Sequence, residues 1–196
     1  MAKAFKRKGG RFVARLDEVE SEVVVGLLQQ TQAFLAPAHR EPTGDPFEDL
    51  VATLGPPPPY DPGAAGPKMP RDPALERLLP TAHREDPAMA AEFRRLTEHG
   101  LRERKTANLA TAISALLTPD GDKVRLDQEQ AQAMLVALTD VRLLLGERLG
   151  LRTDDDAEAL QDRLEAASEG DSELYLAAYY DFMTWLQESL TQALMA

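Results

Sequence analysis

The sequence predicts a mainly α-helical protein: a helical bundle with an N-terminal β-hairpin and a long proline-rich irregular arm. After residue 86, apolar residues recur at helical spacing over most of the chain. Of the 14 prolines, 13 lie between Pro37 and Pro87, where they exclude long helices. One isoleucine and nine valines in 196 residues make strands beyond the first hairpin improbable. We expect a single domain over residues 1–196, with a basic hairpin (3–16), a first helix (17–35), the proline-rich arm with short helices (36–86) and a helical core (87–196).

The hairpin is predicted from residues 3–16, which alternate around the two-residue turn Gly9-Gly10. This turn would pair Lys8 with Arg11, Arg7 with Phe12, Lys6 with Val13, and Phe5 with Ala14. Alternation then gives one apolar face and one basic face. The apolar face would carry Phe5, Phe12, Ala14 and Leu16, and the basic face Lys6, Lys8, Arg11 and Arg15.

Asp17 is expected to cap the first helix, and the acids in its first turn suit the helix dipole. Its predicted buried stripe is Val19, Val23, Leu27 and Phe34. Within the arm, Asp45-Pro46 and Asp72-Pro73 are typical helix starts, for short helices over 47–54 and 73–79. Residues 56–70 should be polyproline-like or disordered unless a partner covers them.

Three long helices are predicted in the core. The first begins after Asp86 and reaches Leu117, with a stripe of Met89, Phe93, Leu96, Gly100, Leu109, Ile113 and Leu116. A short extended piece, 124–126, precedes the second, which Asp127 caps and Gly150 ends; its stripe is Ala131, Met134, Leu138, Val141, Leu145 and Leu149. After a shorter acidic helix (155–167), the third runs over 172–195 with Tyr175, Tyr179, Phe182, Leu186 and Leu190 on one side and Trp185 beside them.

The stripes of the second and third core helices should pack against each other as an antiparallel or near-parallel pair. The aromatic residues of the last helix, Tyr175 to Trp185, fit a buried core. The alternative is a dimer or partner surface, so a homodimer is one expectation from this segment.

Composition excludes several classes of function. The chain has no cysteine, which removes disulfides, thiolate metal sites and thiol chemistry. It shows no signal-peptide pattern and no long apolar run, so we expect a cytoplasmic protein that does not contact a membrane. The net charge is −11, and all of it comes from residues 120–196, so the two halves are expected to favour different partners.

Two basic clusters are candidate sites for binding nucleic acid or a protein partner. The first is the basic face of the hairpin, formed by Lys6, Lys8, Arg11 and Arg15. Residues 1–16 of the chain contain no acid, so this face has a locally positive field. The second, on the first long helix, is Arg95, Arg102 and Lys105. The alternatives are a hairpin kept soluble by its charges and intrahelical pairing, because Glu98 lies four residues before Arg102. No helix-turn-helix spacing is evident, so DNA binding is expected to be weak.

Catalytic, metal and cofactor signatures are missing from the sequence. His39, His83 and His99 have no second histidine at ligand spacing and are interpreted as surface residues. The run of aspartates at 154–156 lacks the spacing of a calcium loop and is interpreted as a helix start. No phosphate-binding, nucleophile or metalloprotease motif occurs. The sequence therefore predicts that the protein is not an enzyme and that it binds no cofactor or metal.

Four segments, 86–98, 101–108, 138–150 and 184–190, resemble an actinobacterial family long filed as a domain of unknown function and commonly encoded next to the protease adaptor ClpS. Some members are described as oxidative-stress transcriptional regulators under the name AosR. The resemblance implies a regulatory protein related to transcription, with a sigma factor or another part of the transcription machinery as partner. The family's regulators sense oxidation through a cysteine pair; this cysteine-free chain lacks that chemistry. The alternative that the resemblance implies is an interaction or adaptor protein of the ClpS and Clp proteolysis pathway.

Overall fold

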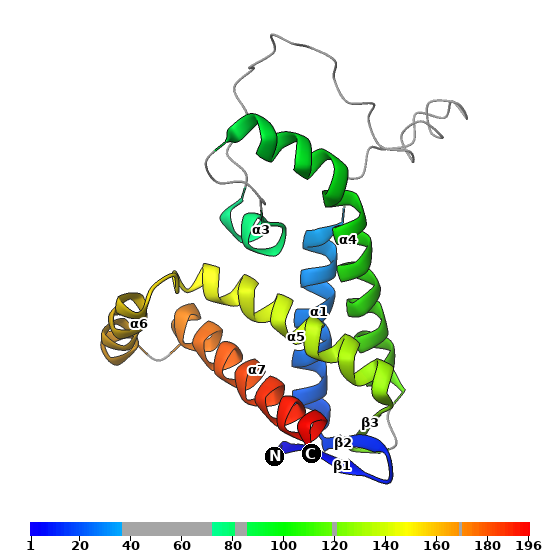
Figure 1. Ribbon diagram of the computed structural model, residues 1–196. Helices are drawn as coiled ribbons and strands as arrows, with labels where there is room; N and C mark the ends of the chain where they lie inside the picture. Colours follow the sequence, from blue (N-terminus) through cyan, green and yellow to red (C-terminus); the bar gives the residue numbers. More distant parts are fainter. Residues whose placement is uncertain (37–71, 81–85, 119–120, 169) are drawn as a thin grey trace, which may run out of the picture.

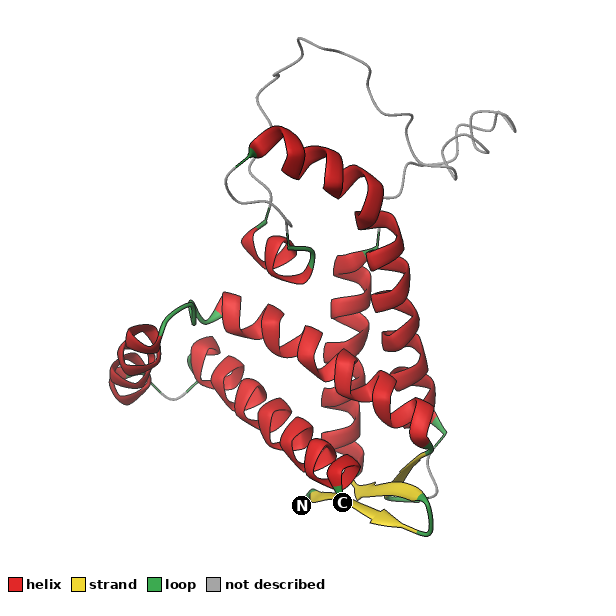
Figure 2. Ribbon diagram, viewed as in Figure 1, coloured by secondary structure: helices red, strands yellow, loops and turns green. Residues whose placement is uncertain are grey.

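The computed structural model describes residues 1–36, 72–80, 86–118, 121–168 and 170–196. In these ranges the protein is mainly helical, with a small antiparallel sheet at one end of the helices (Figure 1, Figure 2). The predicted helix over 47–54 and the segment 56–70 lie outside the described residues. The strands are β1 (Lys3–Lys8), β2 (Arg11–Arg15) and β3 (Lys123–Leu126), and the helices are α1 (Glu18–Leu35), α3 (Pro73–Leu78), α4 (Pro87–Leu117), α5 (Gln128–Arg148), α6 (Asp154–Ala166) and α7 (Ser172–Met195).

The sheet contains the predicted hairpin and one further strand, in the order β1-β2-β3. The predicted pairs Lys8 with Arg11, Arg7 with Phe12 and Lys6 with Val13 are confirmed. The predicted pair Phe5 with Ala14 is wrong, because the register shifts between Lys3 and Lys6. The irregular stretch is where β1 contacts α7: the Phe5 side chain is buried and its N–H donates to the Ser189 hydroxyl of α7, at 3.2 Å, so this part of β1 is positioned by the helix as well as by β2.

The extended piece predicted at 124–126 is β3, which pairs antiparallel with β2. Its inward residues, Val124 and Leu126, join the inward side chains of the hairpin in the core. The predicted apolar face of the hairpin is confirmed, since Phe5, Phe12, Ala14 and Leu16 are all buried.

Helix ends follow the local signals in the sequence. Asp17 accepts a hydrogen bond from the Glu20 N–H while Glu20 returns one to the Asp17 N–H, a capping box at the start of α1. Asp127 and Gln130 form the same arrangement at α5. Gly150 (φ 77°) ends α5 in the left-handed conformation that glycine adopts without strain.

Helix α5 is the centre of the bundle and contacts α1, α3, α4 and α7. All six residues of its predicted stripe are buried. Helix α7 runs antiparallel to it: the Arg142 guanidinium donates to Thr184 (2.9 Å), and Gln187 donates to Thr139 one turn earlier on α5, at 2.7 Å. The predicted pairing of these two helices is confirmed.

Three predicted stripes are wrong in part. The buried side of α1 is Val24, Leu28, Thr31 and Leu35, one residue on from the predicted set, and Val19 is 69% exposed. On α7, the predicted Leu186 and Leu190 are buried, but Tyr175 is 56% exposed and Met183, which was not predicted, is fully buried. Both helices carry apolar residues over a wide part of their circumference. The spacing in the sequence identifies this wide apolar side, but the neighbouring helices and strands decide which of its residues are fully buried.

The N-terminal part of α4 departs further from the prediction. Met89, Phe93 and Leu96 are exposed, whereas Leu109, Ile113 and Leu116 are buried as predicted. Helix α1 runs antiparallel to α4 and ends at Leu35, whose carbonyl accepts a hydrogen bond from Arg102, at 2.6 Å. The turns of α4 before Arg102 therefore extend beyond the end of α1 (Figure 1).

Candidate polyanion-binding face

The outward side of the sheet gathers basic side chains from all three strands. Residues opposite each other in antiparallel strands point to the same side, and the pairs Lys6 with Val13 and Val13 with Arg125 place these three residues together. We call the six basic residues on the regular part of this ladder the basic sheet face; they are Lys6, Lys8, Arg11, Arg15, Lys123 and Arg125. Lys3, opposite Arg15, lies beyond the register shift in β1 and is not counted with them. Lys123 is half-buried and the other five are exposed.

The basic sheet face brings the four predicted hairpin residues together and adds two that the sequence analysis missed. Lys123 and Arg125 alternate with Val124 and Leu126 in the same way that the basic and apolar residues of β2 alternate. This alternation is the signal that could have identified them. It becomes informative only once β3 is known to pair with β2, more than 100 residues away in the chain.

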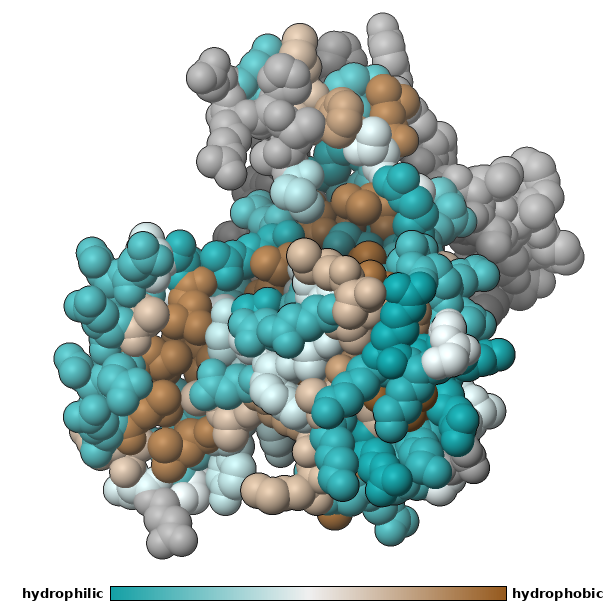
Figure 3. Space-filling model, turned by 60° about the horizontal axis from the view of Figure 1, so that its bottom comes forward, coloured by the Kyte–Doolittle hydropathy of each residue, from teal (hydrophilic) through white to brown (hydrophobic). Residues whose placement is uncertain are grey.

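Like charges face each other across this surface. Lys8 lies opposite Arg11, and Arg15 lies opposite both Lys3 and Lys123. Opposed like charges destabilise an antiparallel sheet rather than support it. Asp122 relieves part of the repulsion: it lies 3.4 Å from the Arg15 guanidinium, with both side chains about half exposed. Figure 3, with the sheet end turned forward, shows hydrophilic side chains covering much of that side of the molecule.

In the second predicted cluster, on α4, two of the three side chains, Arg102 and Lys105, bind other groups of the same protein. Arg102 donates to the Glu98 carboxylate (2.9 and 2.8 Å) and to the Leu35 carbonyl at the end of α1. The i,i+4 pairing expected as the alternative is therefore present. No basic residue occurs in the last turn of α1, so Arg102 supplies the cation that favours a helix C-terminus.

Lys105 contacts a buried carboxylate. Its ammonium pairs with Asp140 of α5, whose side chain is 1% exposed, and the Lys105 side chain itself is 15% exposed. Burial raises the pKa of Asp140 above its usual range, and the hydrogen bond and charge of Lys105 counteract this rise. Asp140 Oδ2 is buried without a hydrogen-bond partner among the described residues. The ammonium of Lys105 is thus directed into the bundle, and the side chain of Arg95 is not described.

The residues considered for metal binding lie apart in the described ranges. His99 is exposed and lies 3.3 Å from Glu103, and His39 and His83 fall outside those ranges. Asp154, Asp155 and Asp156 form the first turn of α6, as predicted, where Asp156 and Thr153 make a capping box. In the described part of the chain, three or more potential ligands do not come together, and no helix there has the length and apolarity to span a bilayer.

These features define a mainly helical protein with a three-stranded sheet whose outer face is basic. Residues 2–194 match the family described as a domain of unknown function (DUF2017), and the chain belongs to that family. Neither the curated proteins nor the solved structures contain a significant match to this chain.

Proposed function

We propose that this protein is a non-catalytic regulator that acts in transcription through a protein partner, with any DNA contact secondary, and that the basic sheet face binds the partner's acidic surface. The observation that carries the proposal is the concentration of six basic side chains on that face of a protein whose net charge is −11. A local positive field on an acidic protein attracts a negatively charged surface and orients the approach.

The absence of catalytic motifs from the full sequence supports a binding role. The link to transcription comes from the resemblance to the actinobacterial regulator family encoded next to ClpS, which also names a sigma factor as the partner class. Thiol sensing is not part of the proposal because the chain contains no cysteine. Regulation would instead depend on binding at the basic sheet face.

Charge reversal at the basic sheet face tests the proposal. Arg11→Glu changes an exposed residue at the tip of the hairpin, and Arg104→Glu makes the same change at an exposed position of α4, away from the sheet. Each variant and the wild type would be used as bait in an actinobacterial lysate. We expect wild type and Arg104→Glu to recover a sigma factor or RNA polymerase subunits, and Arg11→Glu to lose them. Recovery of ClpS or a Clp ATPase instead would favour the adaptor function.

Duplex DNA is the second probe. If all six side chains contacted phosphates, the slope of log K against log salt concentration would be about −5, following the ~0.9 per phosphate expected for B-DNA. Because a secondary DNA contact uses only part of the face, we expect weak binding with a shallower slope. Tight binding with the full slope, and no recovered protein, would make DNA the principal ligand and overturn the proposal.

A further inference from the structure

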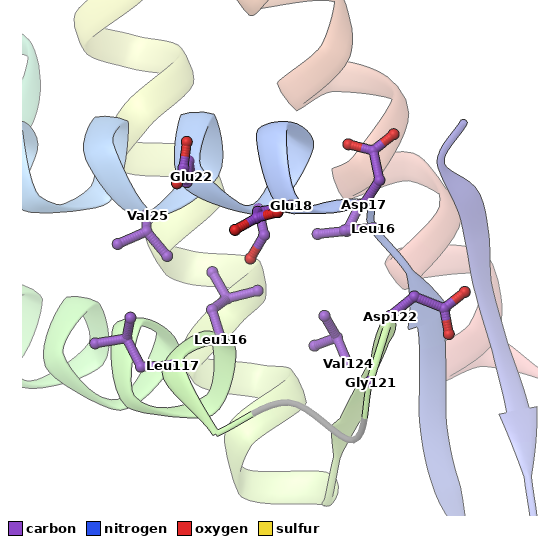
Figure 4. Close-up of a pocket in the computed structure, with 11 residues that line it drawn as sticks. Leu16, Asp17, Glu18, Glu22, Val25, Leu116, Leu117, Gly121, Asp122 and Val124 are labelled. Carbon is purple, nitrogen blue, oxygen red and sulfur yellow. The ribbon is translucent and has the colours of Figure 1, made fainter.

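A groove lies between the N-terminal turns of α1, the end of α4 and the turn that leads into β3. Its volume is about 580 Å³, within the ~300–1,000 Å³ typical of ligand-binding clefts. Figure 4 shows Leu116 pointing from α4 toward α1, and Glu18 pointing from α1 into the space above Leu116. The groove adjoins the basic sheet face only at its rim, where Asp122 lies 3.4 Å from Arg15. Its floor residue Val124 points to the opposite side of the sheet from Lys123 and Arg125.

The floor and the rim of the groove differ in chemistry. The floor is apolar and consists of Leu16, Val25, Leu116, Leu117 and Val124, and the rim carries the carboxylates Asp17, Glu18, Glu22 and Asp122. Leu117 is the most accessible part of the floor, at 61% exposure. We call this feature the acidic-rimmed groove.

Two of the four rim carboxylates, Glu18 and Glu22, have no contact that explains why both are needed for the fold. Asp17 caps α1 and contacts the N-terminal ammonium (3.1 Å), and Asp122 lies beside Arg15. The side-chain carboxylates of Glu18 and Glu22 make no hydrogen bond or ion pair with other described residues. Glu18 lies in the first turn of α1, where the helix dipole favours an acid, but Glu22 lies beyond it. They are one turn apart on the same face, so their charges repel.

We propose that the acidic-rimmed groove is a docking site for a segment of a partner protein that presents an apolar anchor flanked by lysine or arginine. The apolar floor accepts the anchor, and cationic flanks would relieve the repulsion between Glu18 and Glu22. Phosphate-bearing ligands are disfavoured by the same carboxylates.

A second copy of this chain fits the groove less well. On the basic sheet face, the half-buried Val13 is too small and enclosed to fill the floor. Helix α4 has exposed Phe93 and Leu96, but the Arg94 between them is half-buried. A different protein is therefore the proposed occupant. This inference does not depend on the proposed role of the basic sheet face.

A fluorescein-labelled peptide, Gly-Lys-Lys-Leu-Leu-Lys-Lys-Gly, is a suitable probe for fluorescence polarisation with the full chain at low salt. A matched peptide with Ser-Ser in place of Leu-Leu keeps the charge and removes the anchor. Three variants separate the contributions: Glu18→Gln/Glu22→Gln removes rim charge, Leu117→Ser removes the accessible floor, and Glu158→Gln/Asp162→Asn neutralises two exposed acids at the same spacing on α6. All the changed side chains are exposed, so the fold should persist, which circular dichroism would verify.

We expect the Leu peptide to bind with a Kd below about 1 mM and the Ser peptide to bind at least several-fold more weakly. The rim variant should lose roughly two- to thirtyfold in affinity, the range expected for two solvent-exposed charge pairs. Leu117→Ser should also weaken binding, and the α6 variant should bind like wild type. Equal binding of the two peptides, equal losses in the rim and α6 variants, or no binding at 1 mM would each overturn the proposal. Self-association of the unliganded chain that Leu117→Ser abolishes would assign the groove to a second copy.

Discussion

Replacing Lys105 by methionine should destabilise the protein by about 3–5 kcal/mol at neutral pH, the usual cost of removing one partner of a buried ion pair. The Asp140 side chain is 1% exposed, and Lys105 is its hydrogen-bond partner. Methionine retains most of the apolar stem of lysine, so the loss reports the unpaired carboxylate rather than a packing defect. Arg104→Met, one residue away and exposed, should stay within about ±0.5 kcal/mol.

The assay is urea unfolding followed by circular dichroism, with midpoints compared at unchanged m-value. The double variant Lys105→Met/Asp140→Leu should recover most of the lost stability, because replacing both members of a buried pair by apolar residues is often neutral or stabilising. A loss below about 1 kcal/mol in Lys105→Met, or a double variant no more stable than the single one, would refute the assignment of this pair as buried and mutually dependent.

The same variant has a defined pH dependence. Burial raises the pKa of Asp140 in the folded protein above its ordinary value of 3.8, and the loss of Lys105 removes the hydrogen bond and the charge that lower it. The folded state then binds a proton more tightly than the unfolded state. Its stability falls as pH rises from 3.8 through the folded pKa, and levels off above it. The difference between Lys105→Met and wild type should therefore be largest at neutral pH and shrink on acidification. An unchanged difference at acidic pH would mean that Asp140 does not titrate in this range.

Two further predictions concern the core and the sheet. Leu186→Ala should cost about 2–5 kcal/mol in urea unfolding, because the residue is 1% exposed. Phe182→Ala should cost less than the roughly 3–5 kcal/mol of a fully buried phenylalanine, since Phe182 is half-buried and stacks on the partly exposed Trp185, at 5.9 Å; the reverse order would show that the aromatic side of α7 is the true core. Lys8→Glu should stabilise the protein by roughly 0.2–1 kcal/mol, because it replaces a like-charge cross-strand pair with Arg11 by an opposite-charge pair. A destabilised Lys8→Glu variant would contradict the inferred repulsion.

The sequence by itself determined the features that depend on neighbouring residues in the chain. Asp17 and Asp127 mark helix starts because a capping carboxylate needs N–H groups only two or three residues away. The hairpin faces followed from alternation around Gly9-Gly10, since the side-chain period in a strand is two. All six predicted residues of the α5 stripe are buried because their apolar side chains follow one regular pattern and this helix lies at the centre of the bundle. That central place also buries Ala133, Ala137 and Asp140, which the pattern did not indicate.

Tertiary structure decided the features that depend on contacts between distant segments. The end of α1 at Leu35 sets which turns of α4 have a neighbouring helix, so Phe93 is exposed although its spacing matches that of buried residues. Lys105 meets a carboxylate 35 residues away, which local spacing does not encode. Two of the six residues of the basic sheet face, Lys123 and Arg125, come from β3. Sequence reasoning missed them because strand pairing is a long-range hydrogen-bonding choice, and the alternation of Lys123 to Leu126 shows only that the segment is extended.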